Sequence, residues 1–86
     1  MFMTMSEWIA ERRLLGDSLN QLESDGNSGL LAMSNKYMVG GMYIYTSPRY
    51  YIWIDGVLVK ITSIYSEAYE VWNGLKKQQF YRSVGG

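Results

Sequence analysis

The 86-residue chain contains no cysteine, no histidine and only one proline. Without cysteine it can form neither a disulfide nor a thiolate metal site. Without histidine it lacks the imidazole on which most zinc sites and the serine and cysteine triads depend. We therefore expect no metal, no cofactor and no catalytic residue, and the chain is predicted not to be an enzyme.

Long hydrophobic runs are also absent, and no apolar stretch approaches the roughly 20 residues that a membrane helix needs. The first eight residues have no basic region, and Glu7 and Glu11 interrupt any apolar run, which argues against a signal peptide. We expect a cytoplasmic protein with one small domain over residues 1–86, of which 82–86 form a flexible tail.

The net charge is zero, but the charges are unevenly distributed along the chain. Residues 1–25 hold five acidic and two basic side chains, whereas residues 26–86 hold three acidic and six basic ones. A duplex-DNA binder usually has a strongly basic domain. The balance therefore argues against that class of function.

The N-terminal segment has the pattern of a helix. Thr4 and Glu7 match a capping box, in which the side chain of each residue accepts a hydrogen bond from the backbone amide of the other. Apolar residues then follow at helical spacing: Trp8, Leu15, Leu19 and Leu22. We predict a helix over residues 5–23, in which Gly16 costs about 1 kcal/mol against alanine and could cause a kink or an early break.

Residues 30–65 have a β composition, rich in Tyr, Ile, Val and Trp. Asp55-Gly56 predicts a two-residue hairpin turn between two such runs. Residues 36–45 indicate a strand that Gly40-Gly41 interrupts, as a bulge, a close backbone approach or a tight turn between two short strands. Leu30–Met33 is predicted to add a further strand.

The strand register decides which side chains share a face. The Asp55-Gly56 hairpin gives an aliphatic set, Ile52, Ile54, Val57, Val59 and Ile61. With a three-residue loop at 47–49, Tyr45 would oppose Tyr51 and Tyr43 would oppose Trp53, which gathers the aromatic residues on the other face. A two-residue loop would mix the two sets, and a one-residue slip exchanges the faces. We favour the segregated register because helices could then cover one aliphatic face.

Ser66 can cap a second helix, whose apolar stripe is Ala68, Val71, Trp72 and Leu75. The predicted fold class is α+β: an N-terminal helix, an antiparallel β-meander of about four strands and a C-terminal helix. Both helices are expected to cover the same, aliphatic face of the sheet.

The open aromatic face is the candidate site, since Tyr and Trp are frequent among the residues that dominate protein interfaces. The predicted partner-binding residues are Tyr43, Tyr45, Arg49, Tyr51, Trp53 and Lys60. The leading hypothesis is a protein-binding module, an inhibitor or adaptor such as a phage-encoded protein that blocks a host defence system, or a homodimer through the same face. The alternative is a single-stranded nucleic-acid or nucleotide binder that stacks bases on these rings. Ordinary cross-strand pairing on a solvated sheet would also explain the aromatic residues.

Overall fold

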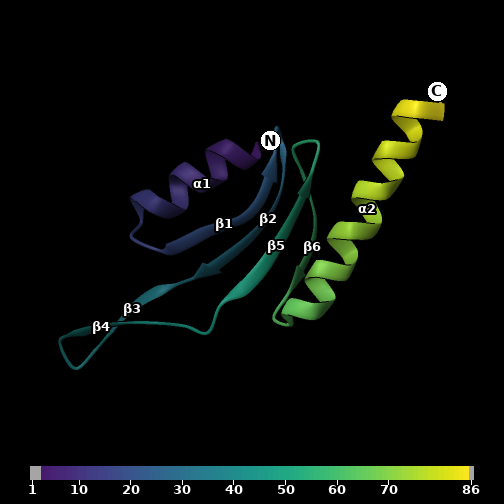
Figure 1. Cartoon of the computed structure of the whole chain (residues 1–86). Helices are drawn as coiled ribbons and strands as arrows, with labels where there is room; N and C mark the ends of the chain where they lie inside the picture. Colours follow the sequence, from purple (N-terminus) through teal and green to yellow (C-terminus); the bar gives the residue numbers. More distant parts are fainter. Residues whose placement is uncertain (1–2, 86) are drawn as a thin grey trace.

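The computed structural model describes the backbone of residues 3–85 and side chains as far as Lys76. The element order is α1 (Met5–Leu14), β1 (Ser18–Asp25), β2 (Ser28–Ser34), β3 (Lys36–Val39), β4 (Met42–Tyr45), β5 (Arg49–Ile54), β6 (Val57–Thr62) and α2 (Tyr65–Gly85) (Figure 1). Four strands form an antiparallel sheet in the order β1-β2-β5-β6, and β3 and β4 form a separate two-stranded sheet. The predicted α+β class is confirmed.

The first helix begins as predicted but ends early. The Thr4 side chain accepts a hydrogen bond from the Glu7 amide, and the Glu7 carboxylate accepts one from the Thr4 amide. The helix ends at Leu14, and Gly16 follows with a φ of +86°, a left-handed conformation that disfavours any side chain. The predicted helix over residues 5–23 is therefore wrong in its second half, which forms β1 because Leu19 packs against the core from the edge of the sheet.

Two tight hairpins build the main sheet around β2 and β5. The predicted turn at Asp55-Gly56 is confirmed, with φ values of 51° and 81° at the two central residues. Ile54 pairs with Val57 and Trp53 with Leu58, which is the register of a two-residue turn, but the register then shifts by one residue between Trp53 and Ile52. The turn between β1 and β2 is bonded to this one, because the Gly56 amide donates to the Asn27 carbonyl at 2.8 Å.

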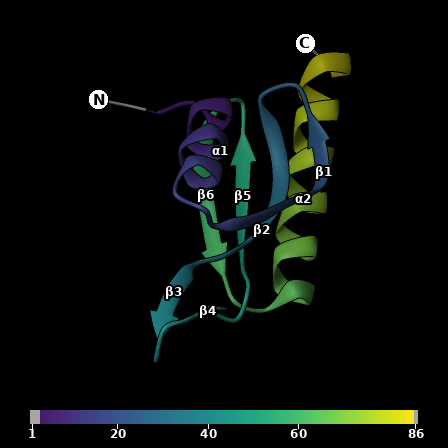
Figure 2. The same ribbon diagram turned by 90° about the vertical axis from the view of Figure 1, so that its left-hand side faces the viewer.

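The two helices lie on opposite faces of the main sheet (Figures 1 and 2). Successive side chains of a strand point to opposite faces. The face beneath α1 buries Met5, Ile9, Leu31, Met33, Tyr51 and Trp53, and the face beneath α2 buries Leu30, Ile52, Ala68 and Trp72. The prediction that both helices cover one face is wrong, because β2 and β5 are central strands with apolar side chains in both directions.

The strands β3 and β4 leave the main sheet and form a hairpin that projects from the body (Figure 1). Gly40 and Gly41 have φ values of +57° and +83°, so the tight-turn interpretation of this pair is the correct one. Tyr45 pairs with Lys36 and Tyr43 with Met38. The favoured register, which placed these tyrosines opposite Tyr51 and Trp53, is wrong because β5 pairs with β2 instead.

The C-terminal helix packs its predicted apolar stripe on the sheet, since Ala68 and Trp72 are buried and Val71 and Leu75 pack against them. The helix includes residues 82–85, which the sequence indicated as a flexible tail, and Gly86 lies outside the described residues. Within the part of the chain that the structure describes, neither helix has both the length and the hydropathy to cross a membrane.

Candidate functional site: the projecting β3–β4 hairpin

Two of the six predicted partner-binding residues belong to the core. Tyr51 and Trp53 are 9% and 4% exposed, respectively, and both lie beneath α1. The Trp8 ring packs on them, with centroid distances of 4.7 Å to Tyr51 and 5.8 Å to Trp53. The predicted open aromatic sheet face does not exist, because the N-terminal helix covers it.

The two predicted basic residues lie apart from each other and from the tyrosines. Arg49 is exposed at the start of β5, where it lines a cavity of about 340 Å³ together with Asn35, Thr46, Ser47, Pro48 and Ser63. Lys60 lies on β6 and forms an ion pair of 3.0 Å with Glu67 of α2. Lys60 therefore acts between sheet and helix rather than beside an aromatic face.

Tyr43 and Tyr45, the remaining predicted residues, lie on the projecting hairpin and are 60% and 52% exposed. Their side chains share a face with Lys36 and Met38, because residues paired across antiparallel strands point the same way. The Lys36 ammonium lies 4.0 Å from the centroid of the Tyr43 ring, a cation–π contact. Lys36 is the only charged residue between positions 36 and 45.

Sequence reasoning missed the rest of this surface. Tyr37, Met38, Val39 and Met42 are also exposed, so apolar side chains cover both faces of the hairpin. We call this surface, residues 36–45, the hairpin surface. The signal was present in the sequence as apolar residues at consecutive positions on both sides of Gly40-Gly41. A half-buried hairpin would instead alternate apolar and polar residues.

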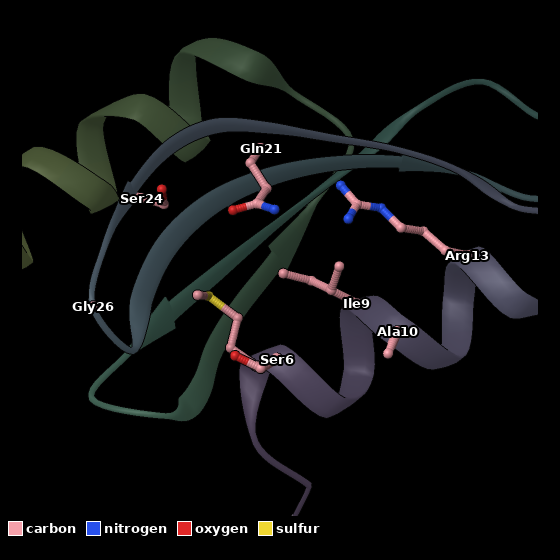
Figure 3. Close-up of a pocket in the computed structure, with 8 residues that line it drawn as sticks. Ser6, Ile9, Ala10, Arg13, Gln21, Ser24 and Gly26 are labelled. Carbon is pink, nitrogen blue, oxygen red and sulfur yellow. The ribbon is translucent and has the colours of Figure 1, made fainter.

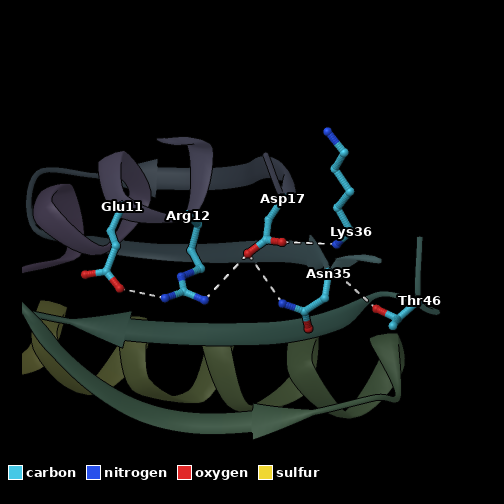
Figure 4. Close-up of polar contacts among 6 residues, drawn as sticks. All are labelled: Glu11, Arg12, Asp17, Asn35, Lys36 and Thr46. Carbon is cyan, nitrogen blue, oxygen red and sulfur yellow. Dashed lines mark hydrogen bonds and ion pairs between the residues drawn. The ribbon is translucent and has the colours of Figure 1, made fainter. Parts of the chain in front are cut away.

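A group of polar contacts holds the root of the hairpin against the body (Figure 4). The Asp17 carboxylate accepts hydrogen bonds from the Lys36 amide at 3.1 Å and from the Asn35 side-chain amide at 3.4 Å, and lies 3.5 Å from the Arg12 guanidinium. The Asn35 amide donates to the Thr46 hydroxyl at 2.9 Å. The Asp17 side chain is only 7% exposed.

Two further cavities border the C-terminal half of β1. The first, of about 280 Å³, lies between α1 and β1, and the Arg13 side chain reaches toward Gln21 across it (Figure 3). The second, of about 510 Å³, lies between β1 and α2, and Asp25 and Lys76 at its rim form an ion pair. A hydrogen bond from Lys76, reinforced by its positive charge, lowers the pKa of the Asp25 carboxyl below its ordinary value of 3.8.

Five of the described carboxylates take part in structural contacts. Glu7 caps α1, Asp17 anchors the hairpin, and Asp25 and Glu67 pair with lysines of another element. Glu11 bonds to Arg12 beside it. Among the residues that the structure describes, no group of three or more acidic side chains could hold a metal ion. The apolar, charge-poor hairpin surface differs from these polar contacts in holding large exposed side chains.

Comparison of the chain with protein-family models, with curated proteins and with solved structures found no match.

Proposed function

We propose that the chain is a non-enzymatic protein-binding module, an inhibitor or adaptor, which contacts its partner through the hairpin surface. One observation carries the proposal: six large apolar side chains on the ten residues from Lys36 to Tyr45 are each 44–67% exposed. A small phage-encoded protein that blocks a host protein in the cytoplasm is one form that such a module would take.

The physical argument starts from the stability of an isolated hairpin. A two-stranded hairpin is at best marginally stable in water, and it needs further strands or a packed helix to become independently stable. β3 and β4 pack extensively only on each other. Contiguous exposed apolar surface on a small domain marks an interaction site. A partner that covers the hairpin surface would thus both remove apolar area from water and stabilise the hairpin.

The composition of the hairpin surface favours a protein as the partner. The centre of a protein interface is enriched in tyrosine and methionine and depleted in charge. The hairpin surface holds Tyr37, Tyr43 and Tyr45 together with Met38 and Met42. Unbranched methionine side chains adapt to irregular partner surfaces. These properties match the depleted charge and large contact area of an interface core.

The test compares two double variants of the full chain. Tyr43→Ala with Tyr45→Ala removes two rings from the hairpin surface, and the control, Val59→Ala with Ile61→Ala, trims two side chains of similar exposure on β6. After capture from the native host and purification of the captured protein, titration should show at least a tenfold loss of affinity in the tyrosine variant alone. Equal affinities of the tyrosine variant and the wild-type chain would refute the proposal.

The second candidate function, single-stranded nucleic-acid or nucleotide binding, is favoured by the exposed tyrosine rings and the Lys36 ammonium beside Tyr43. Aromatic rings stack on bases without sequence preference, and basic groups contact phosphates. Binding that depends on phosphate contacts weakens as salt rises. A labelled oligonucleotide that fails to bind at low salt would eliminate this function, whereas salt-sensitive binding lost on Tyr43→Ala would replace the first proposal with it.

A further inference from the structure

The hydrogen-bond pattern of the hairpin shows which backbone groups point outward. Val39 and Met42 flank the two-residue turn, and the Thr46 amide donates to the Asn35 carbonyl at 2.9 Å. In an antiparallel pair, bonded and non-bonded residue pairs alternate. The pairs 39–42, 37–44 and 35–46 therefore bond to each other, and the amides and carbonyls of residues 36, 38, 43 and 45 point away from the hairpin.

These outward groups are not equivalent on the two strands. On β3, the Lys36 amide already donates to the Asp17 carboxylate. On β4, no described residue accepts a hydrogen bond from the amide of Tyr43 or Tyr45. β4 thus presents two successive outward residues, Tyr43 and Tyr45, on an uncovered edge.

The edge of β4 also carries no charged side chain, no proline and no bulge, three of the features that keep strand edges from pairing. β4 consists of Met42, Tyr43, Ile44 and Tyr45. By contrast, the edge strand β1 carries Glu23 and Asp25 and has a register shift, and the edge strand β6 carries Lys60 beside a register shift of its own. Among the described strand edges, that of β4 is the one with neither a charged side chain nor a register shift, since β3 carries Lys36.

We propose that β4 pairs antiparallel with β4 of a second copy of this chain, about a two-fold axis centred on Ile44. In this register Tyr43 lies opposite Tyr45 of the second copy, and the outward amide and carbonyl of each residue bond to those of the other. The two-fold axis repeats this residue pair on the other side of Ile44. The two hairpins become one four-stranded sheet, in the order β3-β4-β4-β3. The inference rests on the proposed function and deepens it, because the tyrosine faces of two copies then form one continuous contact surface.

The register argues for a second copy as the occupant of this edge. A closed dimer requires a self-complementary patch, and the antiparallel register centred on Ile44 brings equivalent groups together without opposing like charges. Lys36, the nearest charged residue, lies on the far strand of each hairpin. The chain is also neutral overall, so two copies do not repel each other through net charge.

The chain is also more extended than a compact domain of its mass. A compact monomer of 9.9 kDa exposes roughly 5200 Å², whereas this chain exposes 6033 Å². The radius of gyration, 14.6 Å against about 12 Å for a compact domain of this length, shows the same elongation.

Two proline variants test the pairing by sedimentation velocity over a range of concentrations. Tyr43→Pro removes an amide that points to the second copy and takes no part in the β3–β4 ladder, and proline is tolerated at such edge positions. Met38→Pro is the matched control, since it removes an outward amide on the opposite edge. We expect a wild-type dimer, an increase of at least tenfold in its dissociation constant for Tyr43→Pro, and a change of less than threefold for Met38→Pro.

Hydrogen exchange of the wild-type chain gives an independent measurement. The amides of Tyr43 and Tyr45 should become protected as the concentration rises, while the Met38 amide should not. If both proline variants lose the β3–β4 hairpin, the exchange measurement on the wild-type chain decides whether β4 pairs with a second copy. A wild-type chain that stays monomeric at several hundred micromolar, or a Tyr43→Pro variant that dimerises like the wild-type chain, overturns the pairing.

The two proposals can fail separately. A monomeric chain whose affinity for the captured host protein falls on the double tyrosine substitution overturns the dimer and leaves the binding function. Protection of Tyr43 and Tyr45 only after that protein is added assigns the β4 edge to a foreign strand, which also overturns the dimer. If the chain forms the dimer but its affinity for the captured host protein is unchanged by the tyrosine substitutions, the proposed function is overturned and the pairing stands.

Discussion

Trp53→Ala should destabilise the protein by several kcal/mol, in contrast to substitutions on the hairpin surface. Trp53 is 4% exposed, and its ring packs 5.8 Å from Trp8. A buried aromatic side chain removes about 150–250 Å² from water, which is worth roughly 4–6 kcal/mol at about 25 cal/mol per Å². In other proteins, Trp→Ala substitutions in the core cost about 3–5 kcal/mol, which agrees with this figure. The free energy of unfolding of a domain of this length is about 4–13 kcal/mol, so the loss is a large fraction of it.

The assays are urea and thermal denaturation, both followed by far-UV circular dichroism, with Tyr43→Ala as the control. The Tyr43 ring is 60% exposed and contacts Lys36, so its removal should cost less than about 1 kcal/mol. For Trp53→Ala we expect a melting temperature at least about 12 °C below that of the wild-type chain. A loss below about 1 kcal/mol for Trp53→Ala, or an equal loss for the two variants, would refute the burial of the aromatic face beneath α1.

Three further changes test the contacts around the hairpin root and the rim of α2. Gly16→Ala should destabilise by about 1–2 kcal/mol in urea, because its φ of +86° is left-handed and an added Cβ would lie 3.2 Å from the Lys36 side chain; an unchanged midpoint would contradict this. Asp17→Ala should cost about 1–3 kcal/mol and speed exchange of the Lys36 amide, which loses its acceptor. An NMR titration should give Asp25 a pKa below 3.8, returning toward that value in Lys76→Gln. Because the folded-state pKa is lowered, this pair stabilises the protein above the unfolded carboxyl pKa and stops doing so as pH falls through the folded value, so the wild-type chain should lose more stability in acid than Lys76→Gln.

Local signals in the sequence predicted local structure well. The capping box at Thr4, the turn at Asp55-Gly56 and the apolar stripe of α2 each depend on residues a few positions apart, and each is confirmed. The error at residues 18–23 has a different cause. Leu19 and Leu22 fit a helical spacing, but the helix ends before the left-handed Gly16. Residues 18–25 then pair with β2 as the edge strand of the sheet. Tertiary pairing thus outweighed a weak local preference.

The candidate site could be predicted only in part because strand order is not a local property. Tyr43 and Tyr45 were identified as exposed aromatic residues, and the structure leaves both exposed. Tyr51 and Trp53 were assigned to the same face because β4 and β5 follow each other along the chain. In the structure β5 pairs with β2, and this choice alone turns those two side chains toward α1. Nothing in the spacing of 43–53 distinguishes the two pairings.

The position of the hairpin in the chain also affects how freely its sequence can change. Met33 pairs with Arg49 at the end of β2 and β5, so residues 34–48 form an excursion inserted between two strands that are neighbours without it. The bond from the Thr46 amide to the Asn35 carbonyl closes the base of this excursion. The buried clusters draw no residue from 36–45. Substitutions, insertions and exchanges of the whole hairpin can therefore accumulate without disturbing the core, as in a variable loop on a fixed scaffold. The same body could thus carry hairpins of different sequence in different descendants of one chain.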